Sequence, residues 1–262
     1  MAPLSAEPAA KWIELDGGLH YAEFDSPQKA DAGDSKILVV RADPRLYDLQ
    51  LLCLSELGDK AQGLTVRQWA EKHGLVAAIN AGMYQPDEKS NVGYMQNFAH
   101  KNNPRVNSKY LSIAAFNAKA ASLAPFMLFD MEQHKIPEIA KDYHSVVQNL
   151  RLIKRPRINV WTQQDKQWSE AALGQDKQGK VLFIFSRSPY TMHDFNEILL
   201  RLPIEIECAQ HLDGGPPASF YLSTKSVTIE KVGSYESKFF EDHDNKTAWP
   251  LPNVIGLTKK QR

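Results

Sequence analysis

Residues 180–215 of the chain read KVLFIFSRSPYTMHDFNEILLRLPIEIECAQHLDGG. The apolar run 180–186 is typical of a buried strand. Thr191 is a suitable N-cap for a helix, and the residues after it carry an apolar stripe with helical spacing. A second strand is predicted over 204–209, and it leads into the polar, glycine-containing cluster 211–215. The stretch therefore predicts a strand, a helix and a strand that ends at chemically reactive side chains.

The same arrangement is predicted earlier in the chain. The segment 48–54 has the alternation of a strand, and a threonine and a glycine bound a helix over 65–74. The apolar strand 75–79 then runs directly into residues 80–84, NAGMY. Since ligands of open α/β sheets bind beyond strand ends, we expect residues 80–84 and 211–215 to border one site. This inference requires the two strands to be neighbours in one sheet.

The rest of the chain is less regular. Further strands are predicted over 36–41, 111–116 and 126–129, which are rich in apolar residues. Segments 85–110 and 131–145 are polar or contain proline, and we expect loops there. Long loops inside a compact domain are often functional.

The composition is that of an ordinary globular protein. Of 262 residues, 43% are hydrophobic, and 31 basic residues balance 31 acidic ones. A general nucleic-acid binder would need an excess of Lys and Arg, so this class is not expected. No apolar run approaches the roughly 20 residues of a membrane-spanning helix. The common nucleotide-binding, zinc-protease and α/β-hydrolase motifs are absent, and we predict no cofactor and no metal site.

The two cysteines, Cys53 and Cys208, each lie in an apolar, strand-like stretch. We expect both to be buried thiols that pack as small hydrophobic residues. Their spacing does not suggest a zinc site, and a Cys53–Cys208 disulfide is the alternative.

The start of the chain, residues 1–11, is proline-rich and lacks the apolar segment of a signal peptide. We expect a flexible leader there, a domain over 12–258 and a short tail over 259–262. Two interpretations of the leader stay open. It is either what remains after an export signal is removed, with Met1 added, or a natural cytosolic start.

The most unusual segment is 211–217, HLDGGPP. An Asp-Gly pair is also typical of a simple turn between strands. In a site, Asp213 would present a carboxylate that stabilises a cation or activates a water molecule. Gly214 and Gly215 would let the backbone approach a ligand closely, and their N–H groups can bind an anion.

Three further residues have side chains suited to a sugar phosphate. Asn80 offers one acceptor and two donors, and Tyr84 can stack on a sugar ring. Arg187 can bind a phosphate through two hydrogen bonds, which makes it a candidate oxyanion clamp. The alternatives are a turn at Asn80, ordinary packing of Tyr84 and a solvated arginine at a strand end.

Five short segments, in the right order, resemble the phosphodiester glycosidase family. These segments are 78–84 (AINAGMY), 91–94 (NVGY), 172–174 (ALG), 179–185 (GKVLFIF) and 212–215 with 218–221 (LDGG and ASFY). The order and spacing match from about Trp12 to Leu257. The resemblance implies an α/β (α+β) fold, as a single domain with a mixed β-sheet core flanked by helices. It also implies a periplasmic or secreted location, as in bacterial members of the family.

For the activity, the resemblance implies a hydrolase that cleaves a sugar-1-phosphodiester in envelope or extracellular glycans. From residue type we predict catalytic roles for Asp213, Asn80 and Arg187. We predict substrate-binding roles for Gly82, Tyr84, Asn91, His211, Gly214, Gly215 and Ser219. A glycosidase also needs a second carboxylate, and the candidates are Glu170, Asp194 and Asp87.

Two departures from the family pattern favour a different class of protein. Ser169-Glu170 stand where many members have an arginine, and Pro216-Pro217 follow the glycine pair where Ser or Glu is frequent. The alternative is a non-catalytic glycan-binding protein or a structural protein of the cell envelope. Turnover separates these classes, because a binding protein retains a glycan without releasing a product.

Overall fold

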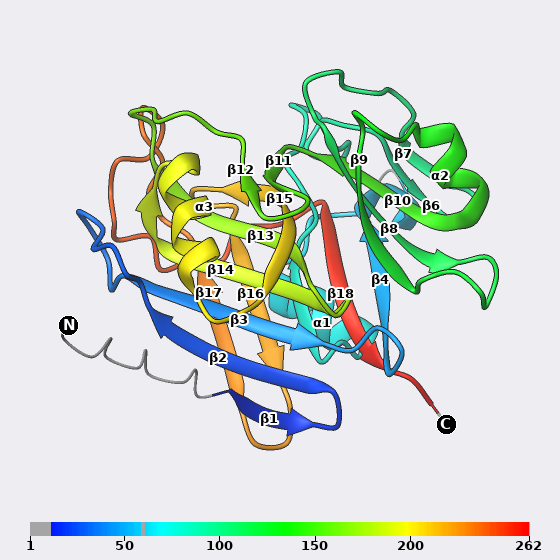
Figure 1. Ribbon diagram of the computed structural model, residues 1–262, viewed down its shortest axis with the longest axis horizontal. Coiled ribbons are helices and arrows are strands. Elements are labelled where there is room, and N and C mark those ends of the chain that lie inside the picture. Colours follow the sequence, from blue (N-terminus) through cyan, green and yellow to red (C-terminus); the bar gives the residue numbers. More distant parts are fainter. Residues whose placement is uncertain (1–11, 59–60, 262) are drawn as a thin grey trace, which may run out of the picture.

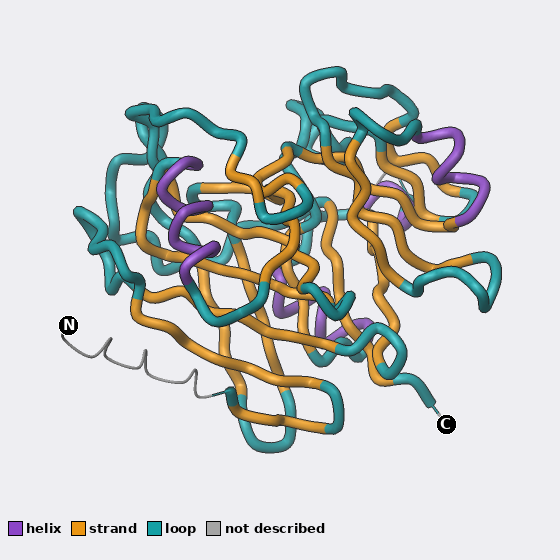
Figure 2. The backbone as a smooth tube through the Cα atoms, viewed as in Figure 1, coloured by secondary structure: helices purple, strands orange, loops and turns teal. Residues whose placement is uncertain are grey.

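The computed structural model describes residues 12–58 and 61–261, and the predicted leader over 1–11 lies outside them. The described residues form three β-sheets in which every strand pairing is antiparallel. Most of the regular secondary structure is β-strand, drawn in orange in Figure 2. The expected α+β fold, with a β-sheet core flanked by helices, is confirmed.

The first sheet has eight strands and extends from the lower left of Figure 1 to its upper centre. In spatial order it contains β1 (Ile13–Asp16), β2 (Leu19–Asp25), β3 (Lys36–Ala42), β14 (Val181–Tyr190), β13 (Trp168–Asp176), β15 (Ile206–Gly214), β11 (Arg151–Lys154) and β12 (Ile158–Asn159). The strands β13 and β15 at its centre carry most of the chemically reactive side chains discussed below.

The other two sheets have five strands each. The second contains, in spatial order, β7 (His100–Asn103), β6 (Met95–Asn97), β10 (Tyr143–Asn149), β8 (Ser112–Ala118) and β9 (Phe126–Asp130). The third contains β17 (Thr228–Val232), β16 (Ser219–Ser223), β5 (Ala77–Asn80), β18 (Asn253–Lys259) and β4 (Tyr47–Cys53). A 3₁₀ turn over Leu54–Leu57 follows β4.

The main core lies where the three sheets face one another. It includes Leu173 and Phe183 from the first sheet, Phe116 from the second, and Ile79 and Phe220 from the third, all fully buried. Burying one such side chain contributes about 1.5–3 kcal/mol to the free energy of unfolding. This shared core joins the sheets, so the ends of strands from different sheets are held in fixed relative positions.

Each α-helix covers the outer face of one sheet (Figure 1). The helix α3 (Met192–Arg201) packs on the first sheet, α2 (Ile136–Asp142) on the second and α1 (Val66–His73) on the third. The N-caps of two of them are as predicted. The Thr65 hydroxyl accepts a hydrogen bond from the N–H of Gln68, and Thr191 does the same for Asp194. Gly74 ends α1 in the left-handed conformation, also as predicted.

Two predicted loops contain regular structure. The segment 85–110 includes β6 and β7, and the segment 131–145 includes α2 and the start of β10. The strands β6 and β7 are mostly polar, so they form through pairing with neighbouring strands rather than through strand propensity. The described residues contain no helix that is both long and apolar enough for a bilayer crossing.

The predicted adjacency of two strands is wrong. The strand β5, which ends at Asn80, belongs to the third sheet, whereas β15 belongs to the first. The expectation came from the βαβ pattern of parallel sheets, whereas the pairings here are antiparallel. The thiols of Cys53 and Cys208 are both buried and free, as expected, and the alternative disulfide is not formed.

Candidate active site

Asp213 and His211 lie on β15 itself, not beyond its end. Asp213 is opposite Ala171 of β13, and His211 is opposite Ala172. One extra residue, Leu212, stands between these pairs and makes a β-bulge. Bulges re-aim neighbouring side chains and are frequent next to active sites.

A buried chain of hydrogen bonds links His211 to β13. Its Nδ1 atom lies 2.6 Å from Oε1 of Glu170, and the indole N–H of Trp168 donates to Oε2 of Glu170 at 2.6 Å. The rings of Trp168 and His211 also meet edge to face. Both oxygens of Glu170 are therefore occupied by groups within the protein.

The two buried partners shift the pKa values of one another. Burial raises the pKa of Glu170, and the charge and hydrogen bonds of His211 and Trp168 offset only part of this. Burial lowers the pKa of His211, but the negative charge of Glu170 and its hydrogen bond outweigh burial, and the net pKa is raised. Each group of the pair therefore binds a proton more tightly than it would at its ordinary pKa.

Asp213 is half-buried next to this pair. Burial raises its pKa to about 7, although the charge of His211 and the N–H of Gly214, which donates to Oδ1 at 2.8 Å, both lower it. This value already includes the charges of Glu236 and Glu170, which also raise it. A carboxyl group with this pKa can hold or release a proton near neutrality, as acid–base catalysis requires.

The two glycines after Asp213 allow close approach of side chains. A Cβ atom on Gly214 would lie 2.3 Å from the Trp168 ring, and one on Gly215 would lie 2.6 Å from Oε2 of Glu236. Gly215 also has a φ of +64°, which disfavours other residues. The glycine pair therefore lets Trp168 and Glu236 pack directly against the backbone beside Asp213.

Asn80, in the other predicted segment, contacts the strand that follows Asp213 and its glycines. Its Oδ1 atom accepts a hydrogen bond of 3.0 Å from the N–H of Ser219, the first residue of β16. Nearby, the charge of Asp213 adds to burial in raising the pKa of Tyr84 to about 12, and the same two causes raise the pKa of Tyr110. The tyrosines thus lie near Asp213 and keep their hydroxyl protons at neutral pH.

Gly82 lies against two buried asparagines. A Cβ atom there would be 2.6 Å from Oδ1 of both Asn91 and Asn149. The amide of Asn149 donates to Ala81 O, and that of Asn91 donates to backbone carbonyls. Within the described residues neither Oδ1 atom, nor the Asn80 Nδ2 or Ser219 Oγ atom, has a hydrogen-bond partner. Such buried polar atoms need partners, and they cluster where binding residues were predicted.

The Arg187 side chain binds backbone carbonyl groups, whereas the sequence predicted a phosphate clamp. Its guanidinium donates to the carbonyl oxygens of Val232, His243 and Asn245 at 2.6, 3.0 and 2.8 Å. These contacts hold the two ends of the segment 232–245 together. The structure thus gathers the other predicted residues around two meeting segments but does not bring the Arg187 guanidinium to them.

Two of the three candidates for a second carboxylate are occupied elsewhere. Asp87 accepts hydrogen bonds from Ser90 in an exposed turn, and Asp194 lies at the start of α3, where it accepts from Gln163. Sequence reasoning missed Glu236, Tyr110, Asn149 and Trp168. No local motif marks them, because long-range pairing of the chain brings them together.

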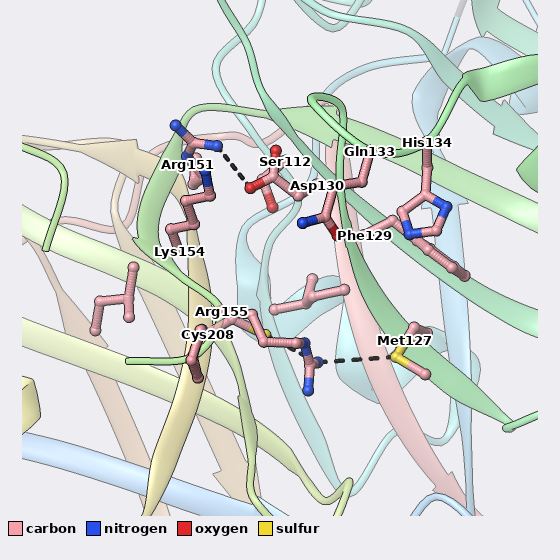
Figure 3. A pocket seen from close by; sticks show the side chains of 13 residues that line it. Ser112, Met127, Phe129, Asp130, Gln133, His134, Arg151, Lys154, Arg155 and Cys208 are labelled. Atoms are coloured by element: carbon pink, nitrogen blue, oxygen red, sulfur yellow. Dashed lines mark hydrogen bonds and ion pairs between the residues drawn. The ribbon is translucent and has the colours of Figure 1, made fainter. Parts of the chain in front are cut away.

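A separate pocket of about 510 Å³ lies between β9 and β11 (Figure 3). Arg151, Lys154 and Asp130 are among its polar lining residues, and Asp213 is not. Arg151 binds Asp130 and Glu132, and Lys154 binds Glu132. These charges are already neutralised within the protein, so we assign the pocket no role.

Comparison with known proteins identifies the family to which the chain is similar. The family model described as phosphodiester glycosidase matches residues 73–258. No curated protein matches the chain.

Several solved structures share the fold, among them the following three. The catalytic domain of zebrafish N-acetylglucosamine-1-phosphodiester alpha-N-acetylglucosaminidase, auto-inhibited by its pro-peptide, is 13% identical with a TM-score of 0.64, and the match covers 96% of this chain and 87% of that one. A hypothetical protein from Synechocystis is 12% identical with a TM-score of 0.62, covering 97% and 64%. A Burkholderia pseudomallei protein described as a candidate exported protein is 9% identical with a TM-score of 0.55, covering 85% and 73%.

At these identities the structural similarity shows only that the fold is shared. The match to the family model shows family membership. The matched region contains Asn80, Asn91, Glu170 and Asp213. The chain therefore belongs to the phosphodiester glycosidase family.

Proposed function

We propose that the protein is a hydrolase that cleaves the bond between the anomeric carbon of a sugar and a phosphodiester oxygen. One observation carries the proposal. Asp213, a half-buried carboxyl group with its pKa raised to about 7, lies beside the buried His211–Glu170 pair in the segment that resembles the family. The zebrafish enzyme is named for its action on N-acetylglucosamine-1-phosphodiesters, and this supports the same bond as the target here.

The reaction places positive charge on the anomeric carbon. As the bond from this carbon to the phosphate oxygen breaks, the electron pair leaves with the phosphate, and a water oxygen bonds to the carbon. The ionised form of Asp213 would stabilise the oxocarbenium-like transition state. A phosphate is a good leaving group, so the site has less need of a strong acid than of charge stabilisation.

The surroundings of Asp213 suit a sugar ring. Tyr84 and Tyr110 are half-buried near it, and each offers an aromatic face together with a hydroxyl donor. Asn80 and Ser219 lie where the two segments approach each other, and the Ser219 N–H donates a hydrogen bond to the Asn80 side chain. We therefore place the sugar at the tyrosines, with its anomeric carbon facing Asp213.

The wider context is part of the same proposal. We propose that residues 12–258 form one catalytic domain that acts on envelope or extracellular glycans after export. The Burkholderia structure, described as a candidate exported protein, supports this location.

The test is release of N-acetylglucosamine from an N-acetylglucosamine-1-phosphodiester. We expect turnover by the wild type and a loss of about 10²–10⁴-fold in kcat for Asp213→Asn. Asp87→Asn is the matched control, because that carboxylate lies in an exposed turn. Equal rates for Asp213→Asn and the wild type would remove Asp213 from catalysis. Binding of the substrate without any release would favour the glycan-binding class instead.

A further inference from the structure

The segment 234–237 is fixed along the beginning of β13. The N–H of Ser169 donates to Tyr235 O at 2.9 Å, and the N–H of Ser237 donates to Gln167 O at 3.0 Å. An isolated antiparallel bridge joins Trp168 to Glu236. The backbone of Glu236 is thereby placed opposite the tryptophan that orients Glu170.

This placement brings the Glu236 carboxyl group to the glycine pair. Its Oε2 atom would lie 2.6 Å from a Cβ atom on Gly215, two positions after Asp213. The charge of Glu236 acts on both Asp213 and His211, and it raises the pKa of each. The two carboxyl groups therefore border the same space.

Glu236 is also chemically available, in contrast to Glu170. Glu170 is fully buried, with one oxygen at His211 and the other at Trp168. Glu236 is half-buried, and among residues 12–58 and 61–261 its side-chain carboxylate forms no hydrogen bond or ion pair. A base must have a free oxygen that reaches the water molecule it activates.

We propose that Glu236 is the second catalytic carboxylate, the base that accepts a proton from the attacking water. This inference rests on the proposed hydrolysis. As the water oxygen bonds to the anomeric carbon, one water proton moves to Glu236, and the phosphate leaves with the electrons of the broken bond. The proton then passes from Glu236 to the released phosphate or to solvent, which restores the carboxylate.

The charged groups around Glu236 come from three parts of the chain. Asp213 and His211 of β15 interact with it electrostatically, Glu170 of β13 contacts His211, and Lys166, just before β13, also acts on it. Burial raises the pKa of Glu236, whereas the charges of His211 and Lys166 lower it. These charges offset only part of the effect of burial, so the net pKa of Glu236 is raised and its carboxylate is more basic than that of an ordinary glutamate.

The experiment compares Glu236→Gln with the wild type on an N-acetylglucosamine-1-phosphodiester. We expect kcat to fall by about 10²–10⁴-fold, with KM changed by less than about threefold. Asp244→Asn is the matched control, an exposed carboxylate of the same segment, and its rate should equal that of the wild type. In Glu236→Ala, added formate should restore part of the lost rate, because a small carboxylate can occupy the position of the base.

Three results overturn the inference and remain distinguishable. If Glu236→Gln keeps the wild-type kcat while Asp213→Asn is inactive, Glu236 is not the base and the proposed hydrolysis stands. If the wild type releases no sugar, the proposed function fails, and the role of Glu236 fails with it. A loss in Glu236→Gln without formate rescue of Glu236→Ala would assign Glu236 a structural role and also contradict the inference.

Discussion

Glu170 and His211 face each other across β13 and β15 at 2.6 Å, and both are buried, with 2% and 3% of their surface exposed. Because Trp168 occupies the other oxygen of Glu170, the carboxylate has one orientation in which to meet the imidazole. The imidazole held in this way has a raised pKa and acts electrostatically on Asp213. It lowers the pKa of Asp213 from what burial alone would produce. The pair therefore adjusts the acidity of the residue that we propose to be catalytic.

Replacing Glu170 with Gln should remove the effect of this residue on the pKa of His211. The imidazole of His211 loses the negative charge that raises its pKa, while the burial that lowers it remains. We expect the His211 resonances in an NMR titration to move at lower pH than in the wild type. Because one partner of a buried pair is removed, the free energy of unfolding should fall by about 3–5 kcal/mol.

The control for this change is Glu132→Gln. Glu132 binds Arg151 and Lys154, but 44% of its side chain is exposed. Exposed ion pairs contribute only about 0–1 kcal/mol, so urea unfolding should change little. An unaltered His211 titration in Glu170→Gln would contradict the coupling.

The stability of the protein should depend on pH through Asp213. Its pKa is about 7 in the folded protein, against an ordinary value of 3.8, so the folded state binds the proton more tightly than the unfolded state does. As pH rises from about 4 to about 7, the contribution of Asp213 to stability is progressively lost. Asp213→Asn has no such charge, and it should raise the melting temperature relative to the wild type near pH 8 but not near pH 4. A melting-temperature difference that is equal at both pH values would contradict the raised pKa.

Gly82 should be intolerant of any side chain. In Gly82→Ala the new methyl group would lie 2.6 Å from the Oδ1 atoms of Asn91 and Asn149, so both amides must move. We expect a loss of about 1–3 kcal/mol in urea unfolding, together with a raised KM. Gly17→Ala is the control, since a Cβ atom at Gly17 would meet nothing within 4 Å. If Gly82→Ala matches the control in both measurements, the asparagines are not part of the site.

Local signals in the sequence were sufficient for the elements that local chemistry defines. The helices after Thr65 and Thr191 were predictable, because a hydroxyl cap and an apolar stripe act within a few residues. The helix α2 was not predictable in this way, because it follows Lys135, which is not a usual N-cap. The strand β7 is polar throughout and exists through its pairing with β6.

The candidate site divides in the same way. Asp213 and its glycines stand out locally, because an acid followed by two glycines is rare in a strand. The roles of Glu170 and Glu236 depend on which strands pair, and the two residues lie 66 positions apart (236 minus 170). The prediction that the segments around Asn80 and Asp213 meet is consistent with the Asn80–Ser219 hydrogen bond, although the strands belong to different sheets.

The variant Arg187→Ala distinguishes a phosphate-binding role of this residue from a structural one. As a phosphate clamp, which its residue type predicts, Arg187→Ala would weaken the binding of phosphate-bearing ligands. The structure instead has its guanidinium bound to the carbonyl oxygens of Val232, His243 and Asn245, at the base of the segment that carries Glu236. We therefore expect Arg187→Ala to leave the calorimetric affinity for inorganic phosphate unchanged.

The same variant should loosen the segment 232–245, because three hydrogen bonds from a charged donor are lost, each contributing about 1.5–3 kcal/mol. Amide hydrogen exchange in this segment should become faster, and kcat should fall because Glu236 is less well placed. Lys36→Ala is a control, since Lys36 binds the exposed Asp25 on the surface of the same sheet. Weakened phosphate binding with unchanged exchange would return Arg187 to the site. Faster exchange and a lower kcat with intact phosphate binding would establish that Arg187 acts through Glu236 and that other groups hold the anion of the substrate. The N–H groups of Gly214 and Gly215 are not free for that role, because they donate to Oδ1 of Asp213 and to Ser169 O.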